Sequence, residues 1–178
     1  MKKSEIKKKV NELLDGGQGR TETFAALAGQ GLKDKPLALL VASYPDPQLC
    51  EVHRGKVRAL VVIMLIQAIF IFFVGYGIGS KIGPNARWIT AFLVTAIPLI
   101  FAWGFYKNRA GTYGAYLLLS FLSVIQTRGF SAAPIATSVG LILNFALMAY
   151  VVYVQGKVFP DIAFMSPKKK SGKFIFST

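Results

Sequence analysis

The amino-acid sequence predicts an all-α membrane protein, in which a four-transmembrane-helix bundle follows a small cytosolic helical segment. Two features of the composition predict this class. Of the 178 residues, 53% are hydrophobic, and the 21 Lys and Arg residues outnumber the 8 Asp and Glu residues. High apolar content with an excess of basic residues is typical of membrane proteins that have basic flanks. We therefore divide the chain into a cytosolic segment (residues 1–56), a transmembrane domain (57–156) and a basic cytosolic tail (157–178).

The transmembrane domain is predicted from four apolar blocks. They cover residues 57–79, 88–106, 112–126 and 132–154. A helix needs about 20 apolar residues to cross a hydrocarbon core of about 30 Å. Three blocks reach or approach that length, and the third is short but apolar enough to cross. We therefore expect four membrane-spanning helices.

Basic residues are distributed unevenly between the two sides of this predicted domain. Lys81, Arg87 and Arg128 fall in the first and third connections. The other 18 basic residues fall in the N-terminal segment, in the second connection, in the tail or, for Arg58, at the N-terminal end of the first apolar block. Because Lys and Arg are retained preferentially on the cytosolic side, both termini are expected there. The first 20 residues have a basic start but no apolar central run, so we expect no cleavable signal peptide. The predicted location is a bacterial inner membrane.

The N-terminal segment carries start signals for three or four short helices. Candidate capping residues are Ser4, Thr21, Asp34 and Asp46. Each has a side-chain oxygen that can accept a hydrogen bond from the first helical turn. A proline follows the last two within two residues, a position that the first turn tolerates.

Apolar side chains recur at helical spacing in the first two of these helices, and they suggest a surface for a protein partner. A segment of about 55 residues buries little core by itself. Leu13, Phe24 and Leu27 are therefore our candidate partner-binding residues.

Polar and small residues inside the apolar blocks are expected to shape helix packing. The letters VGYG at residues 74–77 occur in potassium-channel filters, but here they end the first apolar block with no outer helix before them. Their glycines could let the helix end fray or let a neighbouring helix approach closely. The candidate helix-packing residues are Gln67, Gly75, Gly79, Pro98 and Asn144.

Residues that carry acid, base or metal chemistry are scarce in the predicted membrane domain. The 109 residues between Glu51 and Asp161 contain no Asp or Glu. His53 is the single histidine and Cys50 the single cysteine, and two such ligands make a weak metal site. We therefore expect no catalytic, cofactor-binding or metal-binding residues, and no enzyme activity.

The functional hypothesis from these patterns is a non-enzymatic, polytopic inner-membrane protein that acts through protein–protein interaction. It would be an accessory subunit of a membrane complex or an immunity protein against a membrane-targeting toxin. The alternative is a small channel or transporter. The expected partners are another membrane or membrane-associated protein and anionic lipid headgroups, and the chain could also form oligomers. Its net charge of +13 is explained by the cytosolic bias and by headgroups, so we expect no nucleic-acid partner.

Overall fold

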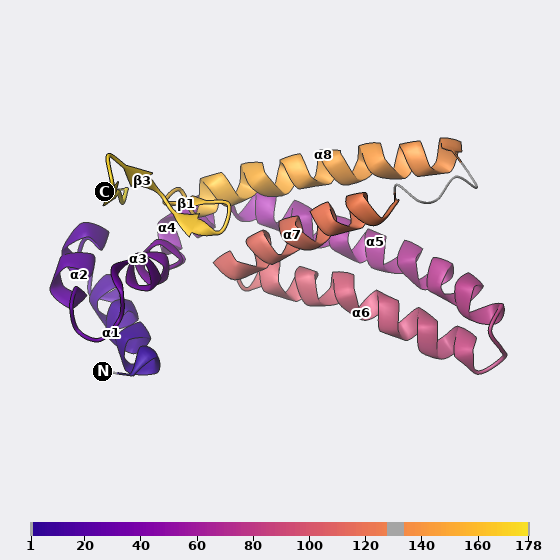
Figure 1. The fold of residues 1–178 in the computed structure, drawn as a ribbon, viewed down its shortest axis with the longest axis horizontal. Coiled ribbons are helices and arrows are strands. Elements are labelled where there is room, and N and C mark those ends of the chain that lie inside the picture. The colour runs from indigo at the N-terminus through magenta and orange to yellow at the C-terminus, as the bar shows by residue number, and fades with distance from the viewer. Residues whose placement is uncertain (1, 128–133, 178) are drawn as a thin grey trace.

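Helices make up most of the computed structural model, which describes residues 2–127 and 134–177 (Figure 1). The described helices are α1 (Lys3–Asp15), α2 (Arg20–Leu27), α3 (Asp34–Ala42), α4 (Pro47–Val52), α5 (Arg54–Ser80), α6 (Ala86–Tyr106), α7 (Ala110–Thr127) and α8 (Pro134–Val158). Four two-residue strands follow them: β1 (Ile162–Ala163), β2 (Ser166–Pro167), β3 (Lys169–Lys170) and β4 (Lys173–Phe174).

Three of these helices are long and apolar enough to cross a membrane, which indicates a helical membrane protein. They are α5, α6 and the Ser138–Val158 part of α8. The fourth predicted span is α7, which is also apolar but shorter. All four helices carry many exposed large apolar side chains, as expected for surfaces that face lipid.

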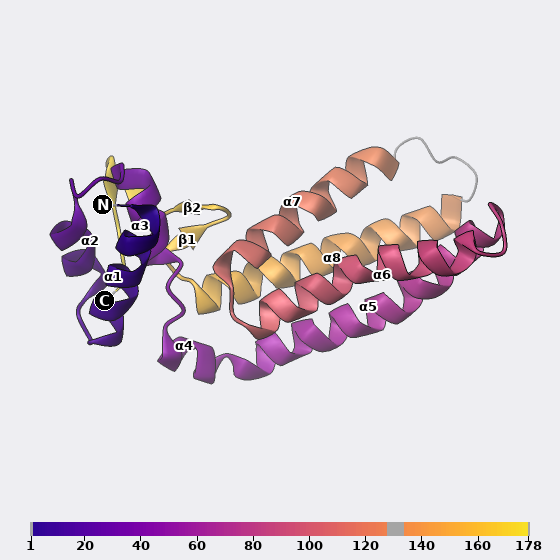
Figure 2. The same cartoon turned by 90° about the horizontal axis from the view of Figure 1, so that it is seen from below.

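The membrane helices form two pairs. α5 and α6 pack along each other as a hairpin, and α7 packs against α8. The pairs lie close at the end nearest the N-terminal helices and diverge toward the other end (Figure 1). In the turned view, α7 rises away from the other three membrane helices (Figure 2). A closed four-helix bundle is therefore not confirmed.

The N-terminal segment folds into the expected short helices, although most of their caps differ from the prediction. Asp46 is confirmed as the cap of α4, because its carboxylate accepts hydrogen bonds from the backbone N–H groups of Gln48 (2.8 Å) and Leu49 (3.4 Å). The other three helices begin earlier than predicted, with Lys2, Gly19 and Lys33 at the N-cap positions.

The C-terminal tail departs from the all-α prediction. β1 pairs with β2, and β3 pairs with β4, as two antiparallel hairpins. Ser171 and Gly172, which connect β3 and β4, both have positive φ angles (51° and 80°). A two-residue hairpin of this twist requires such angles at both turn positions. The turn at Ser171 and Gly172 therefore accounts for a hairpin in a segment that has no periodic apolar pattern.

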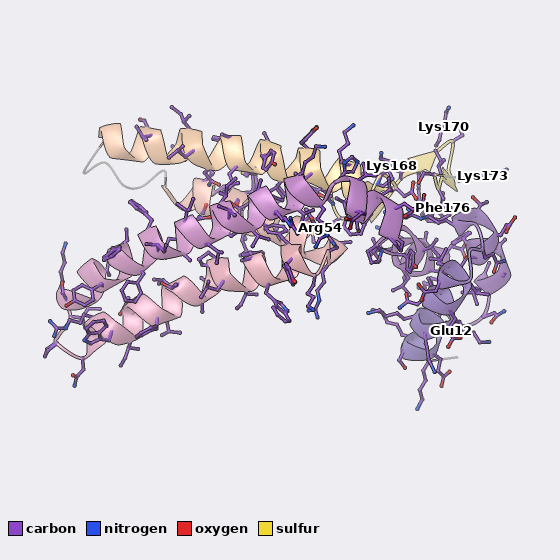
Figure 3. All side chains as sticks on the ribbon, turned by 180° about the vertical axis from the view of Figure 1, so that it is seen from behind. Glu12, Arg54, Lys168, Lys170, Lys173 and Phe176 are labelled. Carbon is purple, nitrogen blue, oxygen red and sulfur yellow. The ribbon has the colours of Figure 1, made fainter. Side chains whose placement is uncertain are left out.

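The tail packs back onto the N-terminal helices and completes their core. Ile6 and Val10 of α1 share this core with Phe159 and Phe176 of the tail. The ring of Phe24 lies 5.6 Å, between centroids, from the rings of both Phe174 and Phe176. Figure 3 shows Phe176 where the tail meets these helices. The two ends of the chain thus form one folded unit, which we call the terminal module (α1–α3 with residues 159–177).

A buried ion pair joins the two halves of the terminal module. Arg20 Nη1 of α2 lies 2.5 Å from Asp161 Oδ2 of the tail, and the side chains are 8% and 5% exposed. Asp161 also accepts hydrogen bonds from the Ser177 backbone N–H (2.7 Å) and hydroxyl (3.1 Å). Nη2 of Arg20 donates to the Tyr44 carbonyl (3.4 Å). These bonds satisfy charges that would otherwise be costly to bury.

Candidate functional site

The membrane domain contains an open cavity of about 870 Å³ between its two helix pairs. Each of the four helices contributes large apolar side chains to its wall, among them Phe70 of α5, Ile97 of α6, Leu119 of α7 and Leu143 of α8. We call it the membrane cavity. Its volume falls within the range of about 300–1,000 Å³ that is usual for binding pockets.

A few polar side chains lie in this apolar wall, near the middle of their helices. Asn144 of α8 donates from Nδ2 to the Ser120 carbonyl (3.4 Å) and to Ser123 Oγ (3.3 Å), both on α7. Gln67 of α5 lines the cavity too, and its Oε1 is buried without a hydrogen-bond partner among the described residues. Asn144 therefore joins α8 to α7, whereas the Gln67 side-chain oxygen has no partner among the described residues.

The two packing glycines of α5 lie against α6. A Cβ atom at Gly79 would come within 2.6 Å of Arg87 Cα, and one at Gly75 within 2.5 Å of Val94 Cγ2. α5 continues through both glycines to Ser80. Of the two roles considered for these glycines, the geometry matches close helix approach rather than fraying.

The proline of α6 contributes to the cavity. Pro98 is buried within the helix and lines the membrane cavity opposite α7 and α8. It has no N–H to donate to the preceding turn. The helix nevertheless runs without interruption from Ala86 to Tyr106.

The candidate partner-binding residues of the N-terminal segment lie mostly inside the terminal module. Leu27 is 3% exposed, and Leu13 and Phe24 are partly buried against the core. The reason for expecting a partner here was uncovered apolar surface, but α1–α3 pack on one another and the tail phenylalanines cover Phe24. Sequence reasoning missed this because the tail lies more than 130 residues away along the chain. The phenylalanines among its lysines were the available signal.

Cys50 and His53, at the end of α4, are the remaining reactive side chains. Burial raises the pKa of the Cys50 thiol, with Asp46 adding to the shift, so it stays protonated at neutral pH. Burial lowers the pKa of His53, and the charges of Lys56 and Lys157 lower it further. Within the described residues, no three His, Cys, Asp or Glu side chains gather in a metal-binding arrangement.

No family model, curated protein or solved structure matches this chain.

Proposed function

We propose that the chain crosses a bacterial inner membrane four times, with both ends in the cytosol. The terminal module supports this topology, because its halves precede and follow the membrane helices yet pack together. A chain whose two ends lie on one side of a membrane crosses it an even number of times. Three helices are long enough to span, so α7 would be the fourth. Its 18 residues reach roughly 27 Å, close to the thickness of the hydrocarbon core.

This topology predicts which sites react with a membrane-impermeant thiol reagent. In a Cys50→Ser background, single cysteines at Asn85 and Ser131 should react in intact cells, whereas cysteines at Lys107 and Lys170 should react only after lysis. Ser131 lies outside the described residues and tests the connection that follows α7. Protection of a cysteine at Ser131 in intact cells, together with labelling at Lys170, would contradict four spans.

We further propose that the protein acts by binding a transmembrane helix of another membrane protein. The membrane cavity is the observation that supports this function. It lies between helix pairs that diverge, so a further helix could enter from the lipid. Gln67 Oε1 would gain a hydrogen-bond partner from such a helix, and intramembrane hydrogen bonds contribute about 0.6–2 kcal/mol each.

Conduction of ions is a weaker explanation of the same cavity. Selective pores are lined by rings of carbonyl oxygens or charged side chains. None of the described residues that line the membrane cavity is charged, and most are apolar. Binding a helix makes use of this lining, whereas an ion would find few ligands. Two roles fit such binding. The protein would be an accessory subunit of a membrane complex, or an immunity protein that binds a helix of a membrane-inserting toxin.

Photocrosslinking from inside the cavity tests this function. A benzoyl-phenylalanine at Leu143 should form a discrete crosslinked protein species in native membranes. The matched control is the same residue at Phe73, which is similarly exposed (68% against 65%) but lies outside the cavity. Gln67→Leu should lower the crosslinking yield at Leu143 by about three- to thirtyfold, the equivalent of one intramembrane hydrogen bond.

The crosslinked species also identifies the occupant. A band at the mass of two copies of this chain would mean self-association instead of a partner. Crosslinks to lipid alone at Leu143, or equal protein crosslinking at Leu143 and Phe73, would contradict the proposed function.

A further inference from the structure

A second cavity, of about 700 Å³, lies between the terminal module and the turn that joins α6 to α7. We call it the interfacial cavity. Its wall combines residues of α1, the end of α3 and the segment after it, and residues 107–112. Its charged side chains are Lys7 of α1 and Lys107 and Arg109 of the turn.

Lys7, Lys107 and Arg109 form no ion pair with any described residue. The ion pairs found within residues 2–127 and 134–177 involve other basic residues, namely Lys8, Arg20 and Arg54. No Asp or Glu lines the interfacial cavity. Tyr44 does line it, and its hydrogen bond to Asp15 raises the Tyr44 pKa to about 12, so this phenol stays neutral. The cavity therefore carries concentrated positive charge with no negative group in its wall.

The cavity lies beside the membrane surface. Trp103 and Tyr106, at the end of α6, are 56% and 65% exposed. Lys107 Nζ lies 5.1 Å from the Trp103 ring centroid and 5.7 Å from that of Tyr106. Exposed Trp and Tyr at a helix end are typical of the headgroup level of a bilayer. Lys107 thus belongs both to this aromatic belt and to the cavity wall.

We propose that the interfacial cavity binds the headgroup of an anionic phospholipid, with Lys7, Lys107 and Arg109 around its phosphate. Arg and Lys are the usual phosphate-binding side chains. The exposed apolar face of α6, which includes Ile100 and Trp103, offers the acyl chains a surface that a soluble anion would not use. The lipid would bridge the membrane helices and the terminal module. This site is separate from the membrane cavity and does not depend on the function proposed for it.

Native mass spectrometry of the purified full-length protein tests this site, with phosphatidylglycerol and phosphatidylcholine as probes. The cavity variant combines Lys7→Gln, Lys107→Gln and Arg109→Gln. The control combines Lys2→Gln, Lys3→Gln and Lys9→Gln, which remove the same charge outside the cavity. Each basic contact near an anionic headgroup accounts for roughly a fivefold change in affinity. We expect the cavity variant to lose phosphatidylglycerol affinity by about a hundredfold and the control by less than about threefold.

Three results would overturn the proposal. Equal losses in the two variants would mean general surface attraction. An unchanged affinity in the cavity variant would place the lipid elsewhere, and displacement of the lipid by equimolar inorganic phosphate would mean a site for soluble anions.

Thermal unfolding in detergent checks that the variants fold. If the cavity variant does not fold, Arg109→Gln alone should lower the affinity by about fivefold, and no change in that variant would also overturn the proposal.

Discussion

Replacing Asp161 with Asn is expected to destabilise the terminal module by about 3–5 kcal/mol, because the change leaves Arg20 charged and buried without its partner. Arg20 is 8% exposed, so water cannot replace the lost carboxylate. Hydrogen exchange of the α2 backbone amides measures the effect in the intact protein. Their protection should fall while protection within α5 and α6 is retained.

A surface ion pair provides the matched control for this change. Glu51→Gln removes the partner of Arg54, which lies 3.3 Å away in a pair whose side chains are 57% and 73% exposed. The stability lost through Glu51→Gln should be below about 1 kcal/mol. The double variant Arg20→Met, Asp161→Leu should recover much of the stability, since two apolar side chains leave no buried charge. Unaltered amide protection in Asp161→Asn would show that the ion pair does not hold the module together.

Replacing Gly79 with Ala is expected to destabilise the α5–α6 hairpin by about 1–3 kcal/mol, because the added methyl group has no space. Its Cβ would lie 2.6 Å from Arg87 Cα and 2.7 Å from the Ala86 carbonyl oxygen, and both are backbone atoms. The two helices must therefore separate to accept it. Thermal unfolding of the purified protein in detergent measures the loss.

Gly77 supplies the control, because it is two residues from Gly79 on the same helix. No described atom beyond its own helical neighbourhood would lie within 4 Å of a Cβ there. Gly77→Ala should be neutral or stabilising by up to about 1 kcal/mol, since Ala favours helices over Gly. Gly79→Ala should thus lower the stability, whereas Gly77→Ala should not. Equal effects would contradict close packing at Gly79.

Three of the four predicted spans are helices long and apolar enough to cross a membrane. Hydropathy could identify them because crossing a bilayer requires long apolar segments whatever their neighbours are. The prediction was poorest for contacts between distant parts of the chain. Asp46 could be identified as a cap because its partners, Gln48 and Leu49, are adjacent in sequence. The contact between Phe24 and Phe176 depends on the path of the whole chain, and no local pattern encodes it.

In the candidate site, too, local features were predictable and contacts between distant parts of the chain were not. Gln67 and Asn144 were predictable as polar residues at membrane depth, where side chains of this kind usually bond neighbouring helices. Their different environments were not predictable, since Asn144 has partners on α7 and the Gln67 oxygen has none among the described residues. That difference follows from the divergence of the two helix pairs, which the helix sequences do not specify individually. Lys7 and Arg109 line one cavity although they are distant in sequence, and this arrangement too depends on the path of the whole chain.

The shared core of the terminal module also sets an order of events during synthesis. The ribosome makes α1–α3 first and the tail last, and chains emerge at roughly 5–20 residues per second. Phe24 therefore lacks its partners in the tail until all the membrane helices have been made. Only a full-length, correctly threaded chain can bring Phe174 and Phe176 to it. A chain that stops before the tail would leave the Phe24 ring without these two partners.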